Sequence, residues 1–398
     1  MKIPDLSAYP VAEAADAVRS ALAQHKKAVL SSPTGSGKST VLPLLLLNEP
    51  WLANRKIVML EPRRIATYAA ANQLARNLNS ELGTLVGYQM RLDRRISAET
   101  RIEVVTEGML TARLQHDPEL ADVGLIIFDE FHERSLQADL ALALALDCAE
   151  SLRDDLRILA MSATIDCSKT AELLDNAPVI ESKGRAYPVE IKYMPRRTDS
   201  TLSEAVADAV TTAYNEKSGS ILAFLPGEGE IRTCEEILKK RIVAPTSYIV
   251  PLYGRLDNSL QRQAIEPAPE NCRKIVLATA IAESSLTIDG VRVVIDSGLT
   301  KIAVYHAPTQ LERLETVPIS QSSAIQRAGR AGRTEPGVAW KLWSEYEDSK
   351  RQASHPSQMS YCDLSQMMLD LAAWGVRNPA DLKFMEPVPE AAWQAAGK

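Results

Sequence analysis

The chain has 398 residues, of which 45% are hydrophobic and 24% are charged, and its formal net charge is −6. This length indicates two domains and a remainder, and the composition excludes a disordered, collagenous or coiled-coil protein. The negative charge gives no support for nucleic-acid binding by the protein surface as a whole, so any such site requires a local basic patch.

Membrane and secretory classes are also disfavoured. The longest apolar stretches, such as residues 140–146, are too short to cross a bilayer, and residues 1–10 lack the apolar core of a secretory signal. The five cysteines lie far apart without a CxxC pair, which argues against a disulfide scaffold or a cysteine-based zinc site. We therefore expect a cytoplasmic protein with no membrane partner.

Short apolar runs alternate with helical patterns along the whole chain. Strands are predicted at 28–30, 57–60, 102–105, 125–128, 158–161, 221–225, 249–251, 275–278 and 291–295. Helices are predicted at 66–78, 136–149, 203–215 and 363–374. Strands that are apolar throughout and separated by helices predict an α/β fold with mostly parallel sheets. A change of composition over residues 181–200 divides the chain into domains at 1–184 and 185–345, followed by a short region at 346–398.

A glycine-rich segment, Ser32-Pro33-Thr34-Gly35-Ser36-Gly37-Lys38-Ser39, follows the first predicted strand and precedes an apolar stretch that we expect to be helical. Such a turn directs backbone N–H groups and a helix N-terminus at phosphate, while the lysine reaches the β- and γ-phosphates and the serine binds Mg²⁺. Ser32 stands where the strict consensus has glycine. The alternative is a flexible surface turn that contains Gly-Lys-Ser by chance.

Two carboxylates end the strand predicted at 125–128, in the order Asp129-Glu130-Phe131-His132. In a P-loop fold, this position suits an aspartate that holds the metal and a glutamate that acts as general base. The alternative is a solvated acidic strand end.

Three arginines recur in Gln326-Arg327-Ala328-Gly329-Arg330-Ala331-Gly332-Arg333. If this run is helical, Gln326, Arg330 and Arg333 share one face, where arginines would stabilise a triphosphate in its transition state. One alternative is a solvated basic face. Another is that Ser323 and Gln326 form a helix capping box.

In order along the chain, these segments and Ser162-Ala163-Thr164 resemble the motifs of DEAH-type superfamily 2 helicases. Further matches are Glu61-Pro62-Arg63-Arg64, Thr106-Glu107-Gly108, Phe224-Leu225-Pro226-Gly227 and the run from Thr279 to Ile288. Asp-Glu-Phe-His-Glu-Arg together with Glu-Pro-Arg-Arg is most similar to the bacterial HrpB type of RNA helicase.

The resemblance implies two tandem RecA-like P-loop domains that hydrolyse ATP with Mg²⁺ in the cleft between them, followed by the start of a C-terminal winged-helix region. The implied nucleotide ligands are Thr34, Gly35, Ser36, Gly37, Lys38, Ser39, Thr40, Asp129 and Asp289, with Mg²⁺ held by Ser39 and Asp129. The implied catalytic residues are Glu130, His132, Gln326, Arg330 and Arg333. Ser162 and Thr164 would couple hydrolysis to movement.

The implied partner is single-stranded RNA, bound by Arg63, Arg64, Arg91, Thr106, Gly227 and Thr279. Backbone contacts of this kind give salt-sensitive binding and do not by themselves distinguish RNA from DNA. A helicase or translocase is the main functional hypothesis, with a monomer as the expected state. Two alternatives are an RNA-stimulated NTPase that remodels RNA–protein complexes, and a nucleotide-gated RNA-binding module without efficient unwinding.

Several positions depart from the family pattern. Gln73 stands in the place of an arginine that stacks on adenine, and Ile265 in that of the facing aromatic residue, so we expect NTPs other than ATP to be used as well.

The segment 300–318 predicts a β-hairpin. Residues 364–398 resemble only the beginning of a winged helix, from which we expect a truncated chain.

Overall fold

The computed structural model describes residues 3–163, 167–184, 187–284, 286, 288–306 and 309–397, and for Asn258 the backbone alone. The chain groups into two compact units. Unit 1 comprises Met1–Gly184, Val304–Arg313 and Pro356–Lys398, and unit 2 comprises Arg185–Ala303 and Leu314–His355.

Unit 1 is built on an eight-stranded sheet with the order β4-β3-β5-β2-β6-β7-β1-β8. Its strands are β1 (Lys27–Ser31), β2 (Lys56–Glu61), β3 (Val86–Met90), β4 (Asp93–Arg95), β5 (Ile102–Thr106), β6 (Val123–Phe128), β7 (Arg157–Ser162) and β8 (Val179–Glu181). Neighbouring strands run parallel, except for the antiparallel pair β3 and β4 at one edge. Buried apolar side chains fill the central strands because helices cover both faces.

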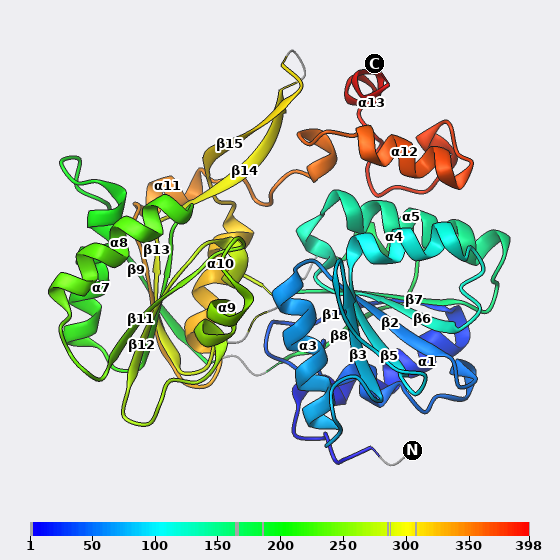
Figure 1. Ribbon diagram of the computed structural model, residues 1–398, viewed down its shortest axis with the longest axis horizontal. Coiled ribbons are helices and arrows are strands. Elements are labelled where there is room, and N and C mark those ends of the chain that lie inside the picture. Colours follow the sequence, from blue (N-terminus) through cyan, green and yellow to red (C-terminus); the bar gives the residue numbers. More distant parts are fainter. Residues whose placement is uncertain are drawn as a thin grey trace. The chain divides into compact units, whose positions relative to one another are not determined.

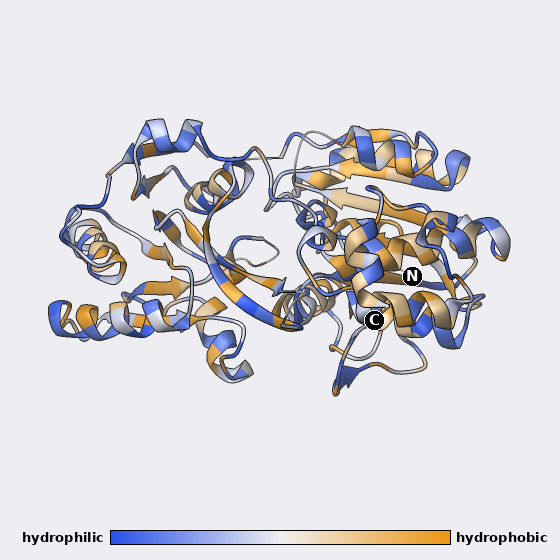
Figure 2. Cartoon of the chain, turned by 90° about the horizontal axis from the view of Figure 1, so that it is seen from above, coloured by the Kyte–Doolittle hydropathy of each residue, from blue (hydrophilic) through white to orange (hydrophobic). Residues whose placement is uncertain are grey.

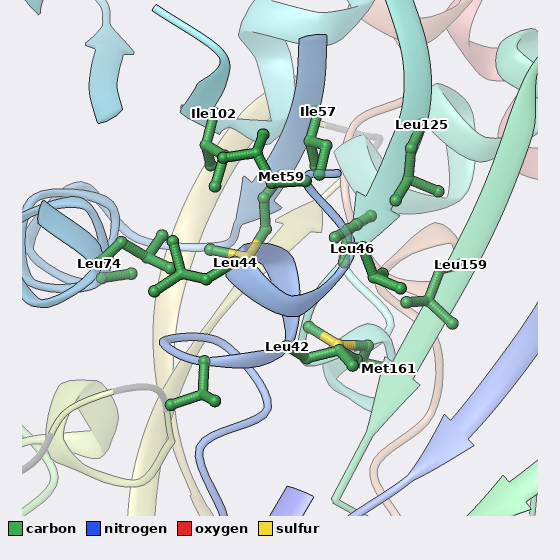
Figure 3. Packing of buried hydrophobic residues seen from close by; sticks show 14 of the residues in the cluster. Leu42, Leu44, Leu46, Ile57, Met59, Leu74, Ile102, Leu125, Leu159 and Met161 are labelled. Atoms are coloured by element: carbon green, nitrogen blue, oxygen red, sulfur yellow. The ribbon is translucent and has the colours of Figure 1, made fainter. Parts of the chain in front are cut away.

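The helices of unit 1 are α1 (Ala15–His25), α2 (Leu42–Leu45), α3 (Arg64–Asn77), α4 (Glu107–His116), α5 (Leu136–Ser151), α6 (Ser168–Leu173), α12 (Ser365–Trp374) and α13 (Glu390–Ala396). Helices α1, α2 and α3 pack on one face of the sheet, and α4 and α5 pack on the other (Figure 1). Figure 3 shows how Leu42, Leu44 and Leu46 insert against the strand residues Met59 and Leu159. In Figure 2 the strands are mainly hydrophobic, whereas the helices carry hydrophilic residues on their outer sides.

The helix expected directly after the phosphate loop is present but short. It is the single turn α2, which begins at Leu42. Pro43 gives the reason, since proline lacks an N–H group and fits only the first turn of a helix. A helix starting at Lys38 would have Pro43 in its interior, where its ring would clash with the carbonyl group of Ser39.

The C-terminal residues of unit 1 pack on the helices α4 and α5. Met367 and Leu371 of α12 are buried in the core on that face, and Trp374 Nε1 donates a hydrogen bond to Asp147 Oδ2 at 2.7 Å. Residues 346–397 are all described and contain helices but no strand. The winged helix stays a prediction.

Unit 2 contains a six-stranded parallel sheet with the order β11-β12-β10-β13-β16-β9. Its strands are β9 (Val189–Tyr193), β10 (Ser220–Phe224), β11 (Ser247–Leu252), β12 (Arg273–Ala278), β13 (Val291–Asp296) and β16 (Gly337–Lys341). Its helices are α7 (Leu202–Glu216), α8 (Glu228–Arg241), α9 (Asn258–Ile265), α10 (Gln321–Gly329) and α11 (Glu345–Ser349). Helices α7 and α8 cover one face, and α10 lies on the other (Figure 1).

The predicted hairpin is present. Strands β14 (Leu299–His306) and β15 (Leu311–Pro318) form a separate two-stranded sheet. The nine strands predicted from the sequence are also present, with ends within two residues of the prediction. No helix among the described residues combines the length and the apolar character that a membrane span requires.

A pair of glycines in unit 1 tests this packing. A Cβ atom on Gly87 of β3 would lie 2.3 Å from the carbonyl oxygen of Arg95 in β4, whereas one on Gly108 of α4 would lie 3.7 Å from its nearest neighbour, Gln137 Oε1. Gly87→Ala should therefore lower the free energy of unfolding by about 1–3 kcal/mol through overpacking. Gly108→Ala should leave it unchanged or raise it by up to about 1 kcal/mol. Urea unfolding monitored by circular dichroism measures both, and equal losses in the two variants would contradict the packing described at β3 and β4.

Candidate functional site

One edge of the unit 1 sheet gathers the predicted motifs. The strands β1, β2, β5, β6 and β7 are parallel, so the segments that follow them meet at their carboxyl ends, where ligands bind in open α/β sheets. The phosphate loop follows β1, Arg63 follows β2, Thr106 ends β5, Asp129 follows β6 and Ser162 ends β7.

The phosphate loop is a narrow turn tied to the neighbouring strand. The Ser32 N–H donates to the Ser162 carbonyl oxygen at 2.9 Å, and Ser32 Oγ donates to Ser36 Oγ at 2.6 Å. Gly35 and Gly37 have φ angles of 86° and 94°, which glycine adopts without strain. The serine at the first position of the loop therefore supports the turn by a hydrogen bond within it.

Lys38 is buried between two carboxylates. Its Nζ lies 2.9 Å from Glu130 Oε2 and 3.4 Å from Asp129 Oδ1, and only 3% of the residue is exposed. Burial opposes the ammonium charge, but the carboxylates of Glu130 and Asp129 outweigh it, so the pKa of Lys38 is raised. Burial and the nearby Glu130 charge raise the pKa of Asp129, although Lys38 opposes them. One ammonium thus faces two acidic groups, an arrangement that a further cation would balance.

Ser39 and Asp129 suit Mg²⁺ in their chemistry. Ser39 Oγ donates a hydrogen bond to Asp129 Oδ2, so a hydroxyl and a carboxylate oxygen lie side by side. Among the described residues no group of three or more His, Cys, Asp or Glu could hold a metal. Mg²⁺ commonly binds through one or two protein oxygens together with substrate phosphates and water, so this small set of ligands fits that ion.

A series of contacts leads from Lys38 to the end of β7. Glu130 has a left-handed backbone with φ of 49°, and the 3₁₀ turn Phe131–Glu133 follows it. This turn brings His132 Nδ1 to 3.5 Å from Glu130 Oε2. The same His132 nitrogen accepts a hydrogen bond from the Ala163 N–H at 3.3 Å. Thr164, the other predicted coupling residue, lies outside the described residues.

The predicted RNA contacts of unit 1 lie on the same edge. Arg64 is exposed, and Arg63 is half-buried and paired with Glu133 at 3.1 Å. Thr106 precedes α4, whose first residue, Glu107, accepts a hydrogen bond from Ser135 Oγ at 2.6 Å. Burial raises the pKa of Glu107 to about 7, although the bond from Ser135 opposes this change. Arg91 is exposed in the turn between β3 and β4.

The predicted residues of unit 2 are divided between two edges of its sheet. Gly227 follows β10 and Thr279 follows β12, which places both at the carboxyl edge. Asp289 is exposed just before β13, and Arg333 comes shortly before β16, at the amino edge. The 3₁₀ turn Arg330–Gly332 also lies at the amino edge, since a Cβ on Gly332 would lie 2.7 Å from Val189 Cγ2 at the start of β9.

Two expectations for the arginine run are wrong. Helix α10 ends at Gly329 and a 3₁₀ turn follows, so a single α-helical face does not hold Gln326, Arg330 and Arg333. Glycine is a poor helix former, which explains the end of the helix. The capping box is also absent, because the N-cap is Ser320, whose side chain accepts from the Ser323 N–H. Gln326 is half-buried within the helix.

The two arginines are nevertheless brought together. Nη1 of Arg330 and Nη1 of Arg333 both donate to the Leu286 carbonyl oxygen, the latter at 2.9 Å. Arg330 is 3% exposed and also donates through Nε to the Glu283 carbonyl oxygen at 3.0 Å. The structure therefore holds this guanidinium against the chain between Thr279 and Leu286 and does not present it to solvent.

Sequence reasoning missed three charged residues at these sites. Glu133 pairs with Arg63, Glu107 lies beside Thr106, and Arg327 is fully buried between carboxylates. Each stands within a motif that was recognised, so proximity in sequence was the available signal. Sequence alone, however, does not indicate which charge of a motif faces inward.

Two known domain families match the chain. Residues 12–173 match the DEAD/DEAH box helicase family, and residues 202–335 match the helicase conserved C-terminal domain. The chain is 47% identical to the ATP-dependent RNA helicase HrpB of Escherichia coli (strain K12), over 96% of this chain and 47% of that protein. It is 37% identical to the ATP-dependent RNA helicase HrpA of the same organism, over 95% of this chain and 29% of that protein.

Solved structures agree with these matches. The crystal structure of the Escherichia coli DEAH/RHA helicase HrpB superposes with a TM-score of 0.93 at 46% identity, covering 98% of this chain and 50% of that one. The chain thus spans about half the length of HrpB and less than a third of the length of HrpA. With both helicase domains matched in order and the phosphate loop and acidic motif assembled at one sheet edge, the chain belongs to the DEAH-box members of the DEAD/DEAH box helicase family.

Proposed function

We propose that this chain is the motor of an ATP-dependent RNA helicase, which hydrolyses NTP and couples hydrolysis to movement on single-stranded RNA. The observation that carries the proposal is the series of contacts from Lys38 through Glu130 and His132 to Ala163. These contacts link the phosphate loop, the acidic strand end and the end of β7. A movement of Lys38 or Glu130 on nucleotide binding would therefore displace the residues at the end of β7.

The residues of unit 1 have distinct proposed roles in hydrolysis. Lys38 exchanges its carboxylate partners for the β- and γ-phosphates, and the loop residues Thr34 to Thr40 surround them. Mg²⁺ held by Ser39 and Asp129 would neutralise developing phosphate charge. Once Lys38 has turned to the phosphates, Glu130 can accept a proton from the attacking water. His132 lies against Glu130 and accepts a hydrogen bond from Ala163, so a movement of Glu130 would be transmitted to Ala163.

Unit 2 supplies the remaining positive charge in this proposal. Arg330 and Arg333 stabilise the charge that grows on the transferred phosphoryl group, and Gln326 orients the attacking water. Asp289 is the proposed contact to the ribose of the nucleotide. Arg330 must exchange at least one of its carbonyl partners to reach a phosphate.

RNA binding rests on residues near the carboxyl edges of the two sheets. Arg63, Arg64, Arg91 and Thr106 are proposed for unit 1, and Gly227 and Thr279 for unit 2. Such contacts to phosphate explain how an acidic protein binds RNA, and they predict binding that weakens as salt rises. None of the five cysteines, all of which are described, forms a disulfide, which fits the cytoplasm as the proposed location.

Steady-state ATP hydrolysis tests the proposal. Turnover is measured without nucleic acid, with single-stranded RNA and with single-stranded DNA, and a duplex with a single-stranded tail is added to follow unwinding. Stimulation by RNA together with unwinding supports the helicase. Stimulation without unwinding supports the remodelling ATPase, and nucleotide-dependent RNA binding without turnover supports the gated module.

Glu130→Gln and Lys38→Ala should separate hydrolysis from binding. Glu130→Gln preserves the shape of the side chain and removes the base, so nucleotide binding should persist while kcat falls by about 10²–10⁴-fold. Lys38→Ala removes the phosphate ligand and should abolish binding of a fluorescent nucleotide. If Glu130→Gln hydrolyses ATP at the normal rate, the glutamate is not the base.

Base selectivity should be weak. Gln73 Nε2 donates to Asn77 Oδ1 at 2.8 Å, and Asn77 Nδ2 donates to the Thr40 carbonyl oxygen at 2.8 Å, so Gln73 is tied to the phosphate loop through Asn77. A glutamine offers no cation–π stacking, so KM values for ATP, GTP, CTP and UTP should agree within about tenfold. A KM for ATP about a hundredfold below the others would contradict this expectation.

Glu107 should make RNA binding depend on pH. Because its pKa is raised to about 7, this group loses its negative charge as the pH falls through that value, and repulsion of RNA phosphates then decreases. From pH 8 to pH 6, the RNA affinity of the wild type should rise about threefold more than the RNA affinity of the Glu107→Gln variant. Fluorescence anisotropy with labelled RNA measures this, and Glu119→Gln, at an exposed position of the same unit, should keep the wild-type pH dependence. An identical pH profile for wild type and Glu107→Gln would rule out the effect.

A further inference from the structure

Arg327 is buried in the middle of the arginine run, three residues before Arg330. Its residue exposure is 1%, and its guanidinium stacks 4.8 Å from the centroid of the Phe224 ring. Nε donates to Glu283 Oε2 at 2.9 Å, and Nη1 donates to Asp296 Oδ1 at 3.0 Å and to the Leu299 carbonyl oxygen at 3.2 Å. Arg327 therefore contacts neither solvent nor an open ligand site.

The three hydrogen-bonding partners of Arg327 lie in different segments of unit 2. Glu283 belongs to the segment from Thr279 to Leu286, Asp296 ends β13, and Leu299 is the first residue of the hairpin strand β14. A guanidinium is planar and donates in fixed directions, so it sets the relative position of several acceptors at once. The side chain thus ties the root of the hairpin to the segment that follows Thr279.

Glu283 continues this connection to the two arginines. Its Oε1 accepts from Ser323 Oγ, and its carbonyl oxygen accepts from Nε of Arg330 at 3.0 Å. Three residues later, the Leu286 carbonyl oxygen accepts from Arg330 and Arg333. The place of Glu283 therefore determines where both guanidinium groups are held.

The buried charges of Arg327 and Asp296 disfavour any separation of the two side chains. Asp296 is 2% exposed, and its Oδ2 has no hydrogen-bond partner among the described residues, so its compensation comes through Oδ1 from Arg327 and from the Gly298 N–H at 2.9 Å. Burial raises the pKa of Asp296, which Arg327 opposes. Any movement of the arginine would leave the buried Asp296 carboxylate without its cationic partner, which is costly.

We propose that Arg327 is a positioning residue, which holds the segment Thr279–Leu286, and through it Arg330 and Arg333, at a fixed place relative to the root of the β14–β15 hairpin. This rests on the proposed function, in which Arg330 and Arg333 act on the nucleotide. Arg327 acts through these residues and does not touch the nucleotide itself.

Arg327→Lys and Glu283→Gln test the connection. Arg327→Lys keeps the positive charge but lacks the planar guanidinium. Glu283→Gln leaves the backbone carbonyl oxygen that Arg330 binds and removes the ion pair with Arg327. In steady-state ATP hydrolysis with saturating RNA, each variant should lower kcat by about 10- to 100-fold, as expected for misplaced catalytic groups. KM for ATP should change by less than about threefold, since the phosphate loop is untouched.

Arg351→Lys is the matched control. Nη1 of Arg351 donates to the Gly298 and Ile319 carbonyl oxygens at 3.0 and 2.9 Å, and among the described residues Arg351 makes no hydrogen bond or ion pair with Glu283. This variant should lower the melting temperature much as Arg327→Lys does, but should keep kcat. Equal kcat values in the Arg327→Lys, Glu283→Gln and Arg351→Lys variants would overturn the proposal and leave Arg327 with a purely structural role.

Two further variants separate the possible failures. The double variant Arg327→Lys with Glu283→Gln should have the kcat of the more affected single variant, because both changes break one contact, and multiplied effects would contradict the connection. Arg330→Ala should lower kcat by about 10³-fold. If Arg330→Ala keeps full turnover, the proposed function of the arginines fails, whatever Arg327 does.

If Arg327→Lys does not fold, Glu283→Gln alone decides the outcome.

Discussion

The buried ion cluster of Lys38, Asp129 and Glu130 sets the geometry of unit 1. An ammonium removed from water requires acidic partners, and these come from a strand end that is 91 and 92 residues away in the sequence. The sheet order places β7 between β1 and β6, so the lysine after β1 reaches the carboxylates after β6 across the end of β7. Ser162, Ala163 and His132 lie at this crossing point, which explains why all three motifs contact one another.

Both units contain one buried cation between two carboxylates, but the cation differs. Lys38 is a compact charge with rotatable donors, which suits a group that exchanges carboxylates for phosphate oxygens. Arg327 has a planar fork that is satisfied in several directions, which suits a group that keeps its partners. One cation with two carboxylates can thus form a contact that is exchanged, as at Lys38, or one that is kept, as at Arg327.

The sequence was informative wherever burial alone determines structure. Every predicted strand is an apolar run between two layers of helices, and the parallel order then brings the residues after those strands to one edge. Local competition was harder to read. Pro43 shortens α2, and Ser320 rather than Ser323 caps α10. Strand β4 is polar and strand β8 has only 3 residues, so neither gives a long apolar run. The partners of Arg63 and Arg330 depend on tertiary contacts with Glu133 and the Glu283 carbonyl group, which no spacing along the chain encodes.

The two edges of the unit 2 sheet impose a route for coupling. Thr279, a proposed RNA contact, lies at the carboxyl edge, whereas Arg330 and Arg333, proposed for the nucleotide, lie toward the amino edge. The chain that begins at Thr279 passes along α10 and reaches the arginines through the carbonyl groups of Glu283 and Leu286. If Thr279 moves with RNA, the displacement meets Glu283 first, and Glu283 is anchored by Arg327. In the proposed role, Arg327 keeps Glu283 at a constant distance from the arginines, so a displacement of Thr279 would reach Arg330 and Arg333, whereas a looser contact at Glu283 would absorb it.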